Sequence, residues 1–158
     1  MPMKPTNSKS RSKSRSKGQA LVEFALTVVF LMILILASLE MIILLYTYSV
    51  LADAAKEGVR YGIVHGTGVG AANCSGPGGG GVTCTDSTGT NVVTAVTTYT
   101  SLSFHDSSAM TITPTYQDSS SVAPSRIRVT VTYPYQPIFG LGWPTVTVYA
   151  AAEGRIVF

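Results

Sequence analysis

The chain has 158 residues, of which 46% are hydrophobic and 12% charged, and its formal net charge is +3. Its lysines and arginines are unevenly placed: six of the eleven precede Gly18, whereas all eight acidic residues follow it. This distribution argues against nucleic-acid binding, which needs positive charge gathered on a folded surface. Once one long apolar run is set aside, enough residues remain for one small domain and not for a second.

Residues 1–17 form a basic leader rich in serine, and because they lack apolar periodicity we expect them to be disordered. Alternating Arg and Ser can mark an RNA-binding tail. Next to a membrane span, however, a basic stretch is more simply a topology signal that keeps the N-terminus in the cytoplasm. A secretory signal peptide fits less well, because its apolar region is about 7–15 residues long and ends at a small-residue cleavage site.

An apolar run extends from Phe24 to Ala52 with Glu40 as its one charged residue. As a helix it would be about 43 Å long, enough to cross a bilayer. Glu23 directly precedes the run, at a place where an ordinary membrane helix would carry Leu or Ala, since charge at membrane depth costs about 2.5–3.5 kcal/mol. Glu40 follows about 26 Å further along and on another face, so the acids bracket the span without forming one site. We interpret Glu40 as a group at the membrane interface or in a helix contact.

The run GQALVEF at residues 18–24 resembles the processing site of the type IV prepilins of tight-adherence (Tad/Flp) systems. In those proteins a prepilin peptidase cuts after Gly and leaves Glu at position five of the mature chain. Together with Glu40 and the Ala-rich ADAAKEGVRYG at 52–62, the run is similar to the TadE-like pseudopilins. Val29 departs from the family pattern, because many members carry proline there. The difference bears on whether the span is kinked and not on the resemblance itself.

The resemblance implies cleavage between Gly18 and Gln19, which would remove the six leader charges. Glu23 would then pair with the N-terminal ammonium of a neighbouring subunit in apolar surroundings, and Phe24 would belong to the recognised motif. The implied protein is bacterial and structural, crosses the cytoplasmic membrane once, and has an extracytoplasmic head. It would act in assembly of a Tad/Flp-type pilus or secretion apparatus. The alternative is an uncleaved, membrane-anchored surface adhesin or ligand-binding module.

The resemblance also implies a set of partners and a division of the chain. The partners would be a prepilin peptidase, other pilins or pseudopilins, the Tad membrane platform proteins and the lipid bilayer. We expect the leader to cover residues 1–18, the transmembrane and amphipathic helix 19–63, and the head 64–158.

Beyond the lipid, an apolar stripe at helical spacing predicts that the helix continues to Ile63. Asp53 with Lys56 and Glu57 with Arg60 form i,i+3 pairs on the opposite face. The small residues of the stripe suit packing against a head sheet and equally against neighbouring helices in a fibre. The stripe consists of Val50, Leu51, Ala54, Ala55, Gly58, Val59, Gly62 and Ile63.

The segment GTGVGAANCSGPGGGG, which begins at Gly66, is rich enough in Gly that we expect a mobile loop without regular structure. Cys74 and Cys84 would lie beyond the membrane, where an oxidising compartment favours a disulfide over two free thiols. Gly66, Gly68 and Ala71 fit the spacing G-x-G-x-x-G/A. A dinucleotide site would need that motif after a strand, whereas here it follows a helix.

The remaining elements predict an α+β head. Thr90–Leu102 is ambiguous between strand and helix, and we expect a helix with Thr90 or Asn91 as its N-cap. Its apolar face would consist of Val92, Ala95, Val96, Tyr99 and Leu102. Alternation predicts three strands, which would form an antiparallel sheet over the amphipathic helix: Met110–Tyr116, Arg126–Tyr133 and Thr145–Val157.

Within those strands, one face should carry Ile127, Val129, Val131 and Tyr133, and another Val146, Val148 and Ala150.

The connection at 134–144 carries four large apolar residues, Ile138, Phe139, Leu141 and Trp143. It could be an exposed contact surface for a pilus subunit, a membrane or a secretion partner. It could also fold back to cap a small head that needs such cover.

Residues suited to catalysis are few: His65, His105 beside Asp106, and scattered serines. The His–Asp neighbours are typical of a helix end or turn, because adjacency in sequence does not make a catalytic dyad. The spacing of the two cysteines and two histidines matches no common zinc pattern. We therefore expect no catalytic activity, metal, cofactor or small-molecule substrate.

Overall fold

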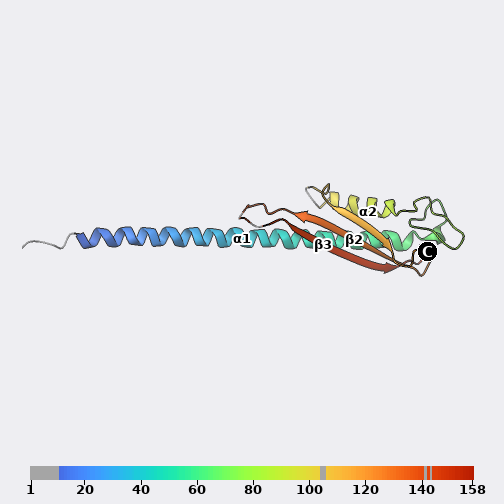
Figure 1. Ribbon diagram of the computed structural model, residues 1–158, viewed down its shortest axis with the longest axis horizontal. Helices are drawn as coiled ribbons and strands as arrows, with labels where there is room; N and C mark the ends of the chain where they lie inside the picture. The colour runs from blue at the N-terminus through green and yellow to red at the C-terminus, as the bar shows by residue number, and fades with distance from the viewer. Residues whose placement is uncertain (1–10, 104–105, 141, 143) are drawn as a thin grey trace, which may run out of the picture. The chain divides into compact units, whose positions relative to one another are not determined.

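The computed structural model describes residues 11–103, 106–140, 142 and 144–158. In chain order, its elements are the helix α1 (Arg11–Val64), a short 3-10 helix η1 (Thr67–Val69), the helix α2 (Thr90–Ser101), and the strands β1 (Thr111–Tyr116), β2 (Arg126–Tyr135) and β3 (Val146–Arg155) (Figure 1). The chain divides into two compact units, residues 1–41 and 42–158, with the boundary inside α1. The predicted α+β class is confirmed: a long apolar helix, a short helix and a three-stranded sheet.

The first unit is an apolar helix with outward-facing side chains. Between Gly18 and Val64, α1 is long and apolar enough to cross a membrane, with a mean hydropathy of 3.0 in its most apolar stretch. Leu21, Phe24 and Phe30 are each between 68% and 69% exposed. A helix that is apolar on its outer surface is stable when lipid or other apolar groups cover it.

The helix begins at Arg11, so the expected disorder of the leader was wrong for residues 11–17. Starting a helix is costly, but extending an existing one adds a hydrogen bond for each residue fixed. Lys and Arg are good helix formers and Ser a moderate one, so the long apolar helix extends backwards through them. Residues 1–10 of the leader lie outside the described residues.

The second unit is built on an antiparallel sheet of order β1-β2-β3. The pairing aligns Ile112 with Val131 and Val131 with Ala150, so one row of side chains crosses the sheet. All three predicted strands are confirmed, with β2 reaching two residues further, to Tyr135. The expected inner face of β2 is also confirmed, because Ile127, Val129 and Val131 have no exposed surface. In β3, Val148 and Ala150 are buried, but Val146 is 46% exposed, contrary to expectation.

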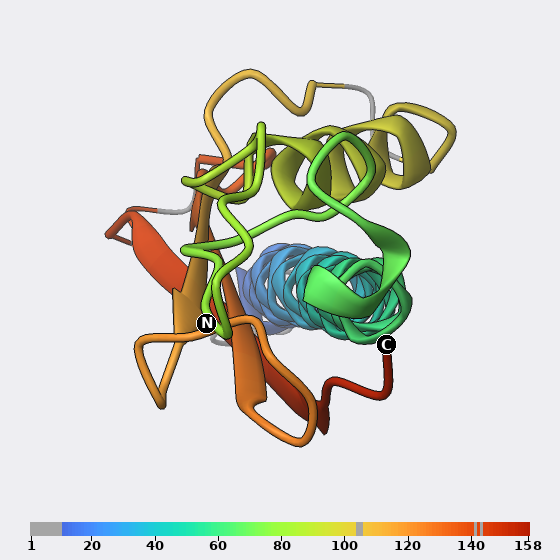
Figure 2. The same ribbon diagram turned by 90° about the vertical axis from the view of Figure 1, so that its right-hand side faces the viewer.

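The core lies between this sheet, α2 and the second half of α1 (Figure 2). Leu51, Ala54 and Ala55 are fully buried, which confirms the predicted stripe. A methyl group added to Gly58 would lie 2.5 Å from Val96 Cγ2 of α2 and 3.1 Å from Val129 Cγ1 of β2. The three elements therefore meet at this glycine. Of the two partners that the sequence left open for the stripe, the head sheet occupies it together with α2.

The predicted helix at Thr90–Leu102 is confirmed as α2, with Val92 and Val96 buried. The assignment of Leu102 to its apolar face was wrong, because this side chain lies just past the last helical residue and is 86% exposed.

Candidate assembly site

The start of the apolar helix brings the predicted cleavage residues and Glu23 onto one surface. Gly18, Gln19 and Glu23, with Val22 and Leu26 beside them, line one shallow groove on α1. They share it because residues three and four apart lie on the same face of an α-helix. Phe24 does not line the groove; it is one position further round the helix and 68% exposed.

Gly18 differs from the glycines of the helix stripe in what surrounds it. Apart from its own stretch of helix backbone, a Cβ at Gly18 would meet no described atom within 4 Å, whereas one at Gly58 or Gly62 would collide with side chains of the core. Packing within the described protein therefore explains the two stripe glycines and does not explain Gly18. A small residue at this position suits recognition by another protein that approaches the backbone closely.

Glu23 is an exposed carboxylate on an apolar surface. Among its neighbours, Val22 is 61% and Leu26 is 66% exposed. In the described part of the chain, no ion pair with a basic side chain involves Glu23. A carboxylate at the edge of an apolar environment is costly unless a cation or hydrogen-bond donor meets it. The geometry therefore suits an ion pair with a group from another molecule.

Glu40 has different surroundings from Glu23. Its side chain is 2% exposed, while Leu39 and Met41 on either side are 43% and 48% exposed. The burial does not identify what Glu40 contacts, so its role as a helix-contact group stays a prediction. Its place at the membrane interface stays a prediction.

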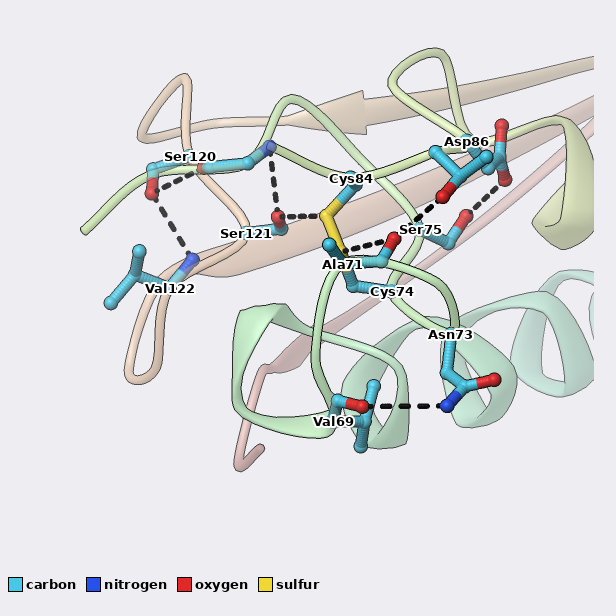
Figure 3. The surroundings of a disulfide bond; sticks show 12 residues. Val69, Ala71, Asn73, Cys74, Ser75, Cys84, Asp86, Ser120, Ser121 and Val122 are labelled. Carbon is cyan, nitrogen blue, oxygen red and sulfur yellow. Dashed lines mark hydrogen bonds between the residues drawn. A yellow bond between two sulfur atoms is a disulfide. The ribbon is translucent and has the colours of Figure 1, made fainter. Parts of the chain in front are cut away.

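In the head, Cys74 and Cys84 form a disulfide, which confirms the predicted bond (Figure 3). Both residues are buried, and Ser121 Oγ lies 3.6 Å from Cys84 Sγ. The same Ser121 Oγ accepts a hydrogen bond from Gly78 N at 3.1 Å, and Ser121 N donates to Gly78 O at 3.0 Å. The glycine-rich segment is thus fastened to the connection between β1 and β2.

The expectation that this segment lacks regular structure was wrong. Thr67–Val69 forms η1, and Gly79 and Val82 exchange two backbone hydrogen bonds of 2.9 and 3.0 Å. Glycine is required at Gly79 because its φ is +136°, a conformation that side chains with a Cβ rarely adopt. The positive φ angles of these glycines allow the segment to turn tightly and to adopt a defined conformation.

The carboxylate of Asp86 caps α2, a role that the sequence analysis missed. Its Oδ1 accepts a hydrogen bond from Thr90 N at 2.7 Å and its Oδ2 accepts one from Asn91 N at 2.8 Å. Ser75 Oγ donates to the same carboxylate at 2.5 Å (Figure 3). The prediction of Thr90 or Asn91 as N-cap was wrong, since Gly89 holds that position without a side-chain bond. An Asp shortly before a Gly and a helical segment is a recognisable sign of such a cap.

We expect Asp86→Asn to lower the stability of the head at neutral pH by about 1 kcal/mol, because the amide nitrogen cannot accept the hydrogen bond that one carboxylate oxygen accepts. Burial raises the pKa of Asp86, but hydrogen bonds from Ser75, Asn91, Thr90 and Gly89 outweigh it and hold the pKa below its ordinary 3.8. A carboxyl with a lowered pKa stabilises the fold above the unfolded-state pKa and loses that contribution as pH falls through the folded-state value.

The measurement is thermal unfolding of the detergent-solubilised protein between pH 7 and pH 2. The wild-type and Asp86→Asn melting temperatures should converge as the pH falls below about 4. Asp53→Asn, a change to an exposed side chain on α1, serves as control. A difference between wild type and Asp86→Asn that stayed constant down to pH 2 would contradict this role for the carboxylate.

The connection after β2 exposes apolar side chains. Ile138 is 65% and Phe139 37% exposed. Leu141 and Trp143 lie outside the described residues. Because two of the four residues lie outside the described ranges, the contact-surface and capping interpretations both stay predictions.

The residues considered for catalysis or metal binding make local contacts within the fold. The ring of His65 stacks on Tyr61 with centroids 3.9 Å apart, and its Nδ1 lies 2.8 Å from Tyr61 O. Asp106 Oδ1 accepts hydrogen bonds from Ser108 N and Ser108 Oγ, the pattern of a turn, and His105 lies outside the described residues. Within the described ranges no group of three His, Cys, Asp or Glu side chains is arranged to hold a metal ion.

Comparison with known proteins gives one match. Residues 18–60 match the family model described as TadE-like protein, which confirms the resemblance over this segment. The matched segment contains the groove with Gly18 and Glu23, the apolar run and most of the stripe, and it ends before the disulfide and the sheet. None of the curated proteins and none of the solved structures compared with the chain matches it.

Proposed function

We propose that this chain, whose residues 18–60 match TadE-like proteins, is a membrane-anchored pseudopilin with a structural role in assembling a Tad/Flp-type pilus or related secretion apparatus. The observation that carries the proposal is the shared helix face of Gly18, Gln19 and Glu23. On that face lie a backbone that packing leaves open and a carboxylate suited to an external cation.

In this proposal a prepilin peptidase cuts the bond between Gly18 and Gln19. Among the described residues, no atom outside its own stretch of helix lies within 4 Å of a Cβ built at Gly18, which supports access of a peptidase to this bond. The six positive charges of the leader hold the N-terminus in the cytoplasm until the cut, after which they are lost. The mature chain then begins with the amine of Gln19.

Glu23 of one subunit pairs with the new amine of its neighbour. In apolar surroundings this ion pair contributes little net stability, but leaving either member unpaired costs several kcal/mol. The pair therefore sets the register in which the helices assemble. The exposed apolar side chains around Glu23 supply the contact area and Glu23 selects the alignment.

The proposed division of the chain has three parts: a leader at 1–18, a membrane and amphipathic helix at 19–63, and an extracytoplasmic head at 64–158. The head packs onto the helix stripe, and the disulfide fastens its glycine-rich segment. It has no catalytic role in this account. Its partners are the peptidase, other pilins or pseudopilins, the Tad platform proteins and the bilayer.

The experiment is deletion of the gene in its native cell, followed by complementation. The proposal expects loss of surface pili and of tight adherence together, with both restored by the intact gene. If pili remain at normal number while adherence falls, the alternative of an uncleaved surface adhesin is correct and the assembly role is not.

A further inference from the structure

We propose that the head rests on the outer surface of the lipid bilayer, on the end from which the apolar helix departs. The contact is made by Leu102 and Ser103 after α2 and by Ile138 after β2. The inference rests on the proposed membrane anchoring and goes beyond it, because an anchored head could equally stand clear of the lipid.

Three segments of the second unit meet at this end. One groove of about 370 Å³ is lined by Ile43, Tyr46 and Thr47 of α1, Ser103 after α2, Tyr135 at the end of β2 and Ile138 beyond it. Tyr46 Oη donates a hydrogen bond to Ser103 O at 3.2 Å, which holds the α2 loop against α1. In Figure 1, the end of β2, the start of β3 and the end of α2 lie at this end of the head.

The surface at this end carries large apolar side chains. On α1, Ile42 is 61%, Leu45 59% and Tyr48 51% exposed. On the loops, Leu102 is 86% and Ile138 65% exposed. Asp106 is an acidic residue in the lining of the groove, and Ser108 hydrogen-bonds its carboxylate.

The length of the apolar helix sets the depth of these loops. A hydrocarbon core of about 30 Å takes about 20 helical residues, so a span that starts at Phe24 leaves the core near Ile43. Tyr46 and Tyr48 then lie in the interfacial layer, where tyrosine is favoured because its ring is apolar and its hydroxyl polar. Ile138 lines the same groove as Ile43, so it lies at the boundary between acyl chains and headgroups.

The bilayer is the occupant that the chain itself brings to this surface. Ile43, which lines the groove, lies two positions after Met41, the last residue of the apolar first unit, so the chain itself brings lipid close to this groove. The sequence carries no charged residue from Met41 to Ala52, and exposed apolar side chains continue along the helix from Met41 to Tyr48. A second copy of the chain would have to displace lipid to reach the loops, and the experiment below includes that outcome.

The test uses the full chain in phosphatidylcholine–phosphatidylglycerol vesicles that contain lipids brominated near the headgroup end of the acyl chains. The only tryptophan in the sequence, Trp143, is replaced by Phe, and a reporter is introduced as Ile138→Trp. The control reporter is Val157→Trp. In the wild type, Val157 is 57% exposed, and its backbone N–H donates a hydrogen bond to Ile63 O near the other end of the head. Equal melting temperatures of the two variants establish that both fold.

We expect bromine to quench the Ile138→Trp fluorescence at least threefold more strongly than that of Val157→Trp. Equal, weak quenching at both positions overturns the inference. The inference is also overturned if bromine does not quench the reporter at Ile138 but its emission maximum shifts to the blue as the protein-to-lipid ratio rises. In that case a second copy of the chain covers this surface. Failure of the protein to float with the vesicles would instead refute the anchoring on which the proposed function depends.

Discussion

Replacing Glu23 with alanine is expected to abolish pilus assembly while membrane insertion and leader removal stay intact. The substitution leaves the amine of the neighbouring subunit without its counter-ion in apolar surroundings. Removing one member of such a pair costs about 3–5 kcal/mol, a loss of more than a hundredfold at each subunit contact. Insertion should not suffer, because an acidic side chain is replaced by one that lipid accepts more readily.

The measurement compares surface pili, counted by electron microscopy, with the amount of processed protein in the membrane fraction. Leu26→Ala is the matched control, because Leu26 lies in the same groove, is 66% exposed and carries no charge. Glu23→Asp should keep partial assembly, since the charge remains on a shorter side chain. Normal piliation in Glu23→Ala, with the processed protein at wild-type level, would refute the pairing role.

Replacing Gly66 with alanine is expected to destabilise the head by about 3 kcal/mol, the upper range for an overpacked core. The added methyl group would overlap the carbonyl oxygen of Phe158 and lie 2.6 Å from Ser121 O. Both are backbone atoms, and Ser121 O is held by a 3.0 Å hydrogen bond from Thr67 N. Ser121 O in particular cannot move aside as the end of a flexible side chain would.

Thermal unfolding of the solubilised protein checks this expectation against Gly70→Ala. Gly70 has a φ of +86° and open space around it, so alanine there introduces backbone strain without a collision. We expect its cost to be about 1 kcal/mol. A melting temperature for Gly66→Ala that equals or exceeds that of Gly70→Ala would show that the approach of Phe158 and Ser121 does not constrain this position.

Features of the fold that repeat along the sequence were predictable. The small apolar stripe of α1 and the alternation in β2 each repeat a single physical requirement, burial of one face, over several residues. The disulfide followed from two cysteines close in sequence beyond a membrane span. The start of the apolar helix could also be predicted, because Glu23 is a charged residue directly before a long apolar run.

Features that depend on contacts between distant segments were not predictable from the sequence. The glycine spacing at Gly66 resembles a nucleotide-binding motif. The structure gives a different reason for the glycine, because the backbone of Phe158 leaves no room for a side chain there. The cap of α2 is an exception, because Asp86 lies only four residues before the helix and precedes Gly89, a local sign that the sequence analysis missed. The partner of the stripe was also open, since small residues suit a sheet and another helix equally.

The identity of the N-terminal residue in the native membrane tests the central claim most directly. The protein is purified from membranes of its own cells, and its intact mass and N-terminal peptide are determined by mass spectrometry. Our account predicts a chain that begins at Gln19, and a chain that retains residues 1–18 in cells lacking the prepilin peptidase. A chain that retains the whole leader in cells with an active peptidase would contradict the account.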